Sequence, residues 1–306
     1  MSDFDPNSKA ERILAPIPAR APAPPVSANP LAGFFRQPKI WMSLPSKGKF
    51  YSEGALEKTE TGEFPVFAMT ARDELLFKTP DALMNGSATV EVVKSCIPNI
   101  KDPWAMPSID IDAVLIAIRI ATYGVEMDVT AQCPSCSAGN DFAVDLRNVL
   151  DSLNQSTFNE KVEIGSDMLV SLRPLTYKQT TQTALKAFEH QRIFSIVNDE
   201  KLSEQDKIKM FQESFIKLTD ITIDSAANCV HKIESVSGST DDTEYIKEFL
   251  SKADKSVFQT INDAINKSTE TGSMSKFHAT CQSCKHEWDV TLTMDQSDFF
   301  GQGFRR

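Results

Sequence analysis

The chain has 306 residues, of which 41% are hydrophobic and 24% are charged, and it carries a formal net charge of -10 with a pI near 5.0. These proportions are those of soluble globular proteins and exclude wholesale disorder and a membrane protein. Two or three folded units are expected at this length, because cores tend to split at about 250 residues. The acidic charge disfavours sequence-independent nucleic-acid binding, since its field repels phosphate backbones.

The sequence predicts a protein made in a cytoplasm, with reduced cysteines. The chain begins Met-Ser-Asp-Phe-Asp-Pro and lacks the basic start and apolar run of a secretory signal. Its longest apolar stretch, residues 113–123, is interrupted by Arg119 and falls short of the roughly 20 residues that span a bilayer. Six cysteines are too few for a disulfide scaffold, so paired cysteines here indicate metal ligands.

Residues 1–38 are predicted to form an extended arm. They include eight prolines and an Ala-Pro run at residues 15–25, which favours polyproline-like conformations. Such an arm either becomes ordered on a partner or stays solvated, and the composition leaves both alternatives open. Phe34, Phe35 and Trp41 favour docking, on this chain or on a neighbour, because large aromatic side chains are costly to leave in water.

Residues 39–124 are predicted to form an N-terminal α+β core. Thr70 is the expected N-cap of a short helix with Asp73 in its first turn, and Gly124 is the expected end of a later helix. The remaining expected elements are strands at residues 40–44 and 64–69 and helices at residues 87–96 and 110–123.

A strand, knuckle and strand pattern occurs twice in the chain. Residues 125–146 alternate apolar and polar side chains on both sides of Cys133-Pro-Ser-Cys136. Residues 277–295 repeat the arrangement around Cys281-Gln-Ser-Cys284. We interpret the two segments as the two halves of one zinc ribbon.

Residues 147–276, between these halves, are predicted to form a mainly helical insert, and residues 296–306 a C-terminal tail. The insert's expected elements are a hairpin at residues 161–164 and 168–172 and helices at residues 177–197, 203–217, 241–251 and 255–268. Phe211 and Phe215 have helical spacing and are predicted to be core residues. The fold class is therefore α+β, with mainly helical domains, short β elements and a split four-cysteine zinc ribbon.

The four paired cysteines, Cys133, Cys136, Cys281 and Cys284, predict one structural zinc ion. Zinc prefers four soft ligands at tetrahedral corners, and each Cys-x-x-Cys turn supplies two thiolates from one tight loop. The large insert between the pairs is no objection, because the cost of closing a loop rises only logarithmically with its length.

This site has three rival interpretations. A redox pair at Cys133 and Cys136 would precede a helix, whereas a strand is expected here. Catalytic zinc needs an open coordination position, which four cysteines would close. A mixed site that includes His278 or His286 is conceivable, but strand or turn positions suit these two histidines better.

No catalytic constellation is recognisable in the sequence, so we expect no enzyme. The chain has no GxSxG, HExxH, Walker or GxGxxG motif. Cys96 and Cys229 have no Cys-x-x-Cys partner and are expected to act as small apolar residues. His190 and His231 are isolated and are assigned no chemistry.

A set of dense, unusual motifs resembles a known family. The motifs are Leu44-Pro-Ser-Lys-Gly-Lys-Phe-Tyr51, residues 69–83, Asn85-Gly86, residues 93–100, Asp102-Pro-Trp104 and residues 109–115. Across about residues 36–146 they resemble the baseplate hub protein family of T-even-type (T4-like) contractile-tailed bacteriophages, and beyond Leu146 the resemblance is weaker. The resemblance implies a structural role in the tail baseplate, a location in the virion, and other phage baseplate proteins as partners.

Three functional hypotheses follow. The first is a hub or hub-proximal baseplate component that holds neighbouring baseplate proteins together, with no membrane and no small-molecule substrate. The second is a hub assembly chaperone that the finished virion does not retain, and the third is a zinc-ribbon nucleic-acid binder, which would need a basic face. Besides the aromatic residues of the arm, the candidate partner contacts are Lys47, Lys49 and Tyr51 in the first motif and Phe299, Phe300 and Phe304 in the tail, which are expected to be exposed.

Overall fold

The computed structural model describes residue 31 and residues 34–196, 203–273, 276–291 and 299–300. The chain divides into two compact units, residues 1–36 and residues 37–306, and each is considered by itself. In the first unit, the N–H group of Phe34 donates a hydrogen bond to the carbonyl of Leu31 at 2.9 Å. The helices and strands described below all belong to the second unit.

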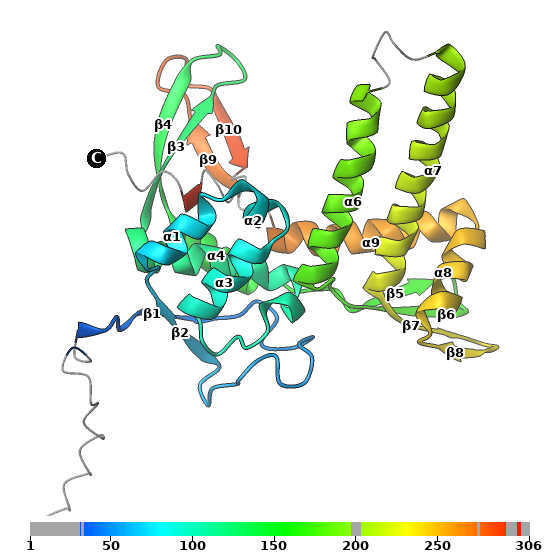
Figure 1. The fold of residues 1–306 in the computed structure, drawn as a ribbon, viewed down its shortest axis with the longest axis horizontal. Helices are drawn as coiled ribbons and strands as arrows, with labels where there is room; N and C mark the ends of the chain where they lie inside the picture. The colour runs from blue at the N-terminus through cyan, green and yellow to red at the C-terminus, as the bar shows by residue number, and fades with distance from the viewer. Residues whose placement is uncertain (1–30, 32–33, 197–202, 274–275, 292–298, 301–306) are drawn as a thin grey trace, which may run out of the picture. The chain divides into compact units, whose positions relative to one another are not determined.

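Residues 37–306 form an α+β unit with two hydrophobic cores (Figure 1). This confirms the predicted fold class. The elements around the first core are β1 Pro38–Ser43, β2 Glu63–Phe67, α1 Ala71–Phe77, α2 Pro80–Met84, α3 Ser87–Cys96, α4 Ser108–Tyr123 and α5 Leu146–Gln155, with a single 3-10 turn at Pro103–Ala105.

Helix α4 is the centre of the first core. It is buried on several faces because α3, α5, the β1 and β2 strands and helix α9, Lys255–Ser273, all pack against it. Val114, Leu115 and Ile118 have essentially no exposed surface. The helix ends at Gly124, whose φ of +97° is a conformation that favours glycine, and whose N–H group donates to the carbonyl of Ile120.

The start of α1 confirms the predicted cap. The Thr70 hydroxyl accepts from the N–H group of Asp73 at 3.3 Å, and the Asp73 carboxylate accepts from the N–H group of Thr70 at 2.8 Å. This reciprocal pair is a capping box, which satisfies two backbone donors at the helix terminus. The same carboxylate accepts from the hydroxyl of Ser95, on α3, and so ties the two helices together.

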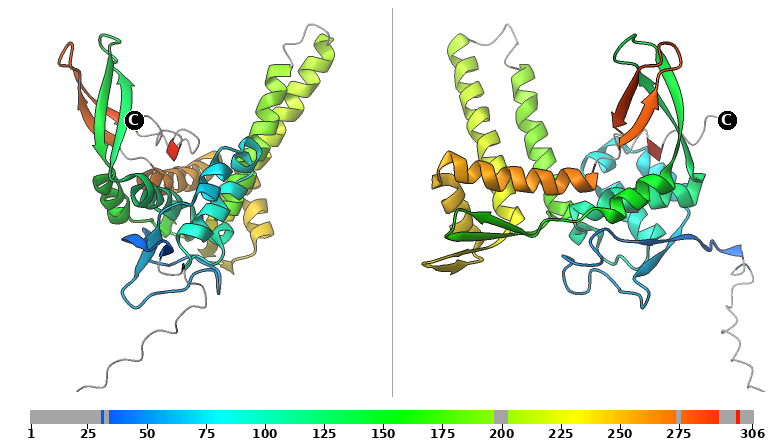
Figure 2. Two further views of the ribbon diagram at one scale, coloured as in Figure 1. Left: turned by 60° about the vertical axis from the view of Figure 1, so that its left-hand side comes forward. Right: turned by 180° about the vertical axis from the view of Figure 1, so that it is seen from behind.

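The second core lies between an antiparallel sheet of order β5-β6-β7-β8 and helices α7, α8 and α9. Val170 and Ile233 come from the sheet, and Ala226, Ile246 and Ile261 come from the helices. Helices α6 and α7 pack as an antiparallel pair (Figure 2). The element bounds are β5 Lys161–Ile164, β6 Met168–Leu172, α6 Tyr177–Ile196, α7 Glu204–Cys229, β7 Val230–Ser235, β8 Gly238–Thr240, α8 Thr243–Lys252 and α9 Lys255–Ser273.

Five elements of the secondary structure differ from the sequence-based expectation. Helix α7 continues to Cys229 rather than ending at Lys217, because packing of Ala226 and Ala227 against the sheet overrides the weak helix propensity of the β-branched residues before them. Strands β7 and β8 and helices α2 and α5 were not predicted. Helix α5 places Val149 and Leu153 in the first core, although the sequence assigned this segment to the insert.

The aromatic stripe on α7 was wrongly predicted to be core. Phe211 and Phe215 are both exposed in the structure, as is Ile208 on the same helix. The helix packs against α6 and the second core through its other faces and its C-terminal half. Helical spacing of apolar residues therefore identified a real helix but not the face that the fold buries.

Candidate metal centre

The first cysteine pair lies in the loop of an antiparallel hairpin made by β3, Glu126–Gln132, and β4, Gly139–Asp145. In the loop between Gln132 and Gly139, the N–H group of Cys133 donates to the carbonyl of Ala138, and the N–H group of Ser137 donates back to the carbonyl of Cys133, each at 2.9 Å. Ser137 has a φ of +58°. These bonds hold a tight knuckle that directs two sulfurs to one side.

The second pair repeats this local geometry in the hairpin of β9, Lys276–Thr280, and β10, Glu287–Thr291. The N–H group of Cys281 donates to the carbonyl of His286 at 2.8 Å, and the N–H group of Lys285 donates to the carbonyl of Cys281 at 3.0 Å. Lys285 has a φ of +61°, in the position that Ser137 occupies in the first loop. The hairpins are thus an internal structural repeat, and they lie side by side in Figures 1 and 2.

The two hairpins bring all four cysteine sulfurs together. Their Sγ atoms lie within 4.8 Å of one another, and two pairs that cross between the hairpins, Cys133 with Cys284 and Cys136 with Cys281, are 3.6 Å apart. Tetrahedral zinc with Zn–S distances of about 2.3 Å separates its sulfurs by about 3.8 Å. The cluster is therefore a possible split metal site of the right size for zinc.

The close approach of the sulfurs and their backbone partners shifts the pKa values of two of these thiols in opposite directions. Backbone N–H groups of Cys284 and Ser283 lower the pKa of Cys281 to about 6. The pKa of Cys136 is about 12, because hydrogen bonding to Cys284 and burial outweigh the lowering effect of the Ala138 backbone. Four thiolates this close would repel one another unless a cation lay between them.

Asn140 joins the two knuckles and was not identified from the sequence. This side chain is 3% exposed, and its Oδ1 atom accepts from the N–H group of Gln282 at 2.8 Å. Its Nδ2 atom donates to the carbonyl of Ala138 at 2.9 Å and lies 3.6 Å from Sγ of Cys281. Such partners orient metal ligands and adjust their basicity. No periodicity or spacing in the sequence singles out this asparagine.

Aromatic side chains also pack across the interface between the two hairpins. Phe142 on β4 makes edge-to-face contacts with Phe277 on β9 and Trp288 on β10, at centroid distances of 5.6 and 5.9 Å. His286 stacks on Trp288, and His278 pairs with Asp289 at 3.2 Å, so neither histidine joins the sulfur cluster. The mixed Cys/His alternative is therefore not the arrangement observed.

The two remaining cysteines are buried and are not part of the sulfur cluster. Cys96 belongs to the first core and Cys229 ends α7. Burial raises the pKa of Cys229 to about 12, so this thiol stays protonated. Their placement agrees with the expected role as small apolar residues.

A buried carboxylate anchors the Leu-Pro-Ser-Lys-Gly-Lys motif. Asp110, on α4, accepts from the N–H group of Ser46 at 2.7 Å, from the Ser46 hydroxyl at 2.5 Å and from the Tyr51 hydroxyl at 3.0 Å. Desolvation raises the pKa of Asp110 to about 6 despite these hydrogen bonds. Lys47 and Lys49 are exposed as expected, but the exposure predicted for Tyr51 is wrong, because its hydroxyl points inward to Asp110.

The expected exposure of the C-terminal aromatic residues is also wrong for Phe299 and Phe300. They are 3% and 4% exposed, and the ring of Phe300 stacks on Phe77 at 4.3 Å. Arg119 donates to the carbonyl of Phe299 and lies over its ring. Burial within this chain removes both side chains from the candidate partner contacts. Phe304, the third candidate, lies outside the described residues.

In the described part of the chain, no helix has the length and apolar character needed to cross a membrane. The fold and the site define the class of protein. It is an α+β protein whose four-cysteine site is assembled from two hairpins that precede and follow a mainly helical region in the sequence. Residues 38–301 match the family described as T4 bacteriophage base plate protein, and the chain belongs to this family. The match extends well beyond residues 36–146, which carry the recognisable motifs. No match was found among curated proteins or among solved structures.

Proposed function

We propose that this protein is a structural component of a contractile phage tail, at or near the hub of the baseplate, where it holds neighbouring baseplate proteins together. The observation that carries the proposal is the family match over residues 38–301. The role requires binding and shape rather than turnover, so the proposal includes no catalysis. Its partners are other baseplate proteins, and its location is the virion.

The proposal includes a structural zinc ion bound by Cys133, Cys136, Cys281 and Cys284. The size of the sulfur cluster and the four-thiol ligand set support this assignment. Zinc would fasten the C-terminal hairpin to the hairpin that follows the first core, and so close the chain around the helical insert. The ion would then stabilise the fold directly, because the unfolded chain offers no preformed site.

The remaining candidate contacts lie on exposed side chains. Trp41 is 59% exposed on β1, and Lys47 and Lys49 project from the turn that Asp110 anchors. Phe34 and Phe35, in the first unit, are exposed as well. Exposed tryptophan and phenylalanine are enriched at protein interfaces, which supports these residues as contacts to neighbouring proteins.

Mass spectrometry of purified phage and of isolated baseplates tests the role. We expect the chain in both preparations at a stoichiometric ratio to the other baseplate proteins. Its presence in assembly intermediates but absence from finished particles would instead identify an assembly chaperone. A phage carrying Trp41→Ala should assemble fewer baseplates, whereas Tyr245→Ala, at an exposed aromatic residue on α8, is the matched control and should assemble normally.

Metal analysis of the purified native chain tests the zinc site. We expect about one zinc per chain, together with loss of the cooperative thermal transition when a strong chelator is added. Protein without metal that melts identically with and without chelator would refute the structural zinc ion, while leaving the family assignment intact.

A further inference from the structure

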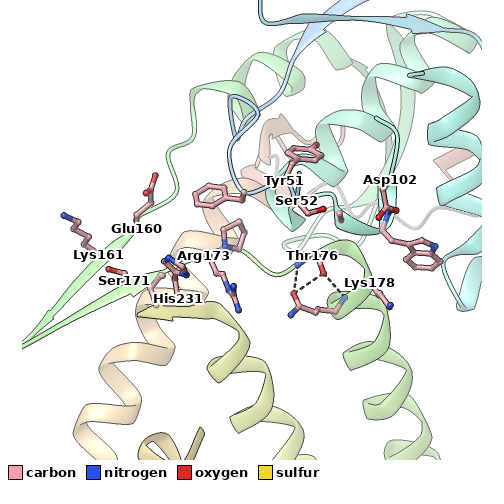
Figure 3. A pocket seen from close by; sticks show the side chains of 16 residues that line it. Tyr51, Ser52, Asp102, Glu160, Lys161, Ser171, Arg173, Thr176, Lys178 and His231 are labelled. Atoms are coloured by element: carbon pink, nitrogen blue, oxygen red, sulfur yellow. Dashed lines mark hydrogen bonds between the residues drawn. The ribbon is translucent and has the colours of Figure 1, made fainter. Parts of the chain in front are cut away.

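A cleft of about 850 Å³ opens between the first core and the sheet of the second (Figure 3). One wall comes from residues 50–52, Asp102 and residues 104–105, and the other from β5, β6, the start of α6 and His231 on β7. The cleft is remote from the cysteine cluster, and none of the four cysteines lines it. Its size is that of a binding pocket rather than a packing defect.

Backbone pairing holds the two walls in a fixed relation. Pro107 and Thr176 form an isolated antiparallel bridge. The N–H group of Ser108 donates to the carbonyl of Leu175, and the N–H group of Tyr177 donates to the carbonyl of Met106, each at 2.7 Å. The cleft is therefore preformed, so a ligand need not order either wall.

Aromatic side chains make part of the cleft surface. Trp104 stacks on Tyr177 at 5.6 Å, and Phe50 packs edge-to-face on Phe158 at 5.8 Å. Tyr51 is fixed through its hydrogen bond to Asp110. Rigid aromatic walls favour an apolar or aromatic side chain of a ligand, since their ordering cost is already met within the fold.

Cationic groups outnumber free anionic groups around the cleft. Lys161, Arg173 and Lys178 line it, and the N-terminus of α6 opens into it, capped by the reciprocal Thr176 and Gln179 pair that Figure 3 marks with dashed lines. Of the two lining carboxylates, Glu160 is paired with Lys49 at 2.9 Å, which leaves the Asp102 carboxylate, an acceptor for the N–H group of Trp104, as one negative charge against three positive ones. A chain with net charge -10 thus presents a local positive cleft.

We infer that this cleft binds an extended acidic segment of a neighbouring baseplate protein, with at least one aromatic side chain flanked by carboxylates. The inference rests on the proposed structural role and adds the chemistry of one partner. Carboxylates would meet Lys161, Arg173 and Lys178, and the aromatic side chain would lie against Trp104 or Phe50. A nucleic acid fits less well, because the closely spaced phosphates would face the strongly acidic remainder of the chain.

Lys178→Glu is the variant that isolates this interaction. Lys178 is exposed in the first turn of α6, where an acidic residue interacts favourably with the helix dipole, so the substitution should not unfold the helix. Lys186→Glu is the matched control, with the same charge change at an exposed position of the same helix outside the cleft. Melting temperatures of both variants equal to that of the native chain establish that the fold is intact.

The probe is an array of overlapping 15-residue peptides that cover all baseplate proteins of the phage, this chain included, incubated with the purified full-length protein. We expect acidic, aromatic-containing peptides from another baseplate protein to be retained. Fluorescence anisotropy with the best such peptide should show at least tenfold weaker binding for Lys178→Glu, no change for Lys186→Glu, and weaker binding as salt is raised.

Four outcomes would overturn the inference. In the peptide array, these are the retention of no peptide, the retention of peptides without acidic residues, and the retention of peptides from this chain alone, which would indicate a second copy as the occupant. In the anisotropy measurement, it is equal binding by Lys178→Glu and the native chain. Lys178-dependent binding of a dT20 oligonucleotide would indicate a nucleic-acid site instead. Detection of the chain in finished baseplates is independent of the array, so failure of the inference is distinguishable from failure of the proposed function.

Discussion

The Nδ2 atom of Asn140 lies 3.6 Å from Sγ of Cys281, although 141 residues separate the two along the chain. The same side chain accepts from the backbone of the residue after Cys281, so one buried amide connects both knuckles. This contact couples the sulfur cluster to the pairing of the two hairpins. It makes Asn140 a positioning residue for the proposed zinc ligands.

Asn140→Ala should lower the affinity for zinc about 10- to 100-fold, because the amide no longer orients Cys281 and the Gln282 N–H group loses its acceptor. Competition with a chromophoric chelator measures the change. Asn140→Asp keeps an acceptor for Gln282 but places a negative charge beside the thiolates, so we expect an intermediate loss. Native affinity in both variants would argue against any positioning role.

Cys284→Ser should remove stoichiometric zinc and destabilise the fold. Zinc at about 1,000 times its dissociation constant would raise the free energy of unfolding by about 4 kcal/mol. Loss of zinc binding should therefore lower the urea concentration at the midpoint of unfolding. Cys96→Ala is the control, since this buried thiol lies in the first core and should leave zinc content unchanged. A native midpoint and full zinc content in Cys284→Ser would contradict the four-cysteine assignment.

Phe300→Ala should lower the free energy of unfolding by about 3 kcal/mol, because it removes a buried ring stacked on Phe77. Phe34→Ala, at a ring that is 86% exposed, should change the free energy by less than about 0.5 kcal/mol. Urea unfolding followed by circular dichroism measures both. Equal and small effects would mean that the C-terminal aromatic residues do not contribute to the first core.

Asp112→Asn should stabilise the protein at pH 8 more than at pH 5. Desolvation raises the pKa of Asp112 from 3.8 to about 6 in the folded state. The protonated carboxyl therefore contributes stability below pH 4, and this contribution is lost as the pH rises through 6. The stabilisation of the variant relative to the native protein should grow by about 1.4 kcal/mol between pH 5 and pH 8, because about one pH unit of this range lies below the folded pKa. Urea unfolding at both pH values tests it, and parallel pH profiles would contradict the raised pKa.

Local signals in the sequence were sufficient for much of the fold. The capping box at Thr70, helix α3 at residues 87–96 and the hairpin at residues 161–172 were predicted from caps, periodicity and turn residues, and the structure confirms each. Helix α5 also carried a readable signal, since Leu146, Val149, Leu150 and Leu153 have the spacing of one helical face. The strand-like alternation of Phe142 and Val144 also runs to Leu146, so the two patterns overlap at the residue where the helix begins.

The sequence by itself determined the α+β class, the repeated Cys-x-x-Cys pattern and the resemblance to baseplate proteins, because each depends on residues close together in the chain. Only the tertiary structure decided which surfaces are buried. It exposed Phe211 and Phe215, buried Phe299 and Phe300, turned Tyr51 inward to Asp110, and placed Asn140 between the knuckles. These outcomes depend on contacts between residues distant in sequence, and the physical reason is that spacing along one element fixes its apolar face but not the neighbour that covers it.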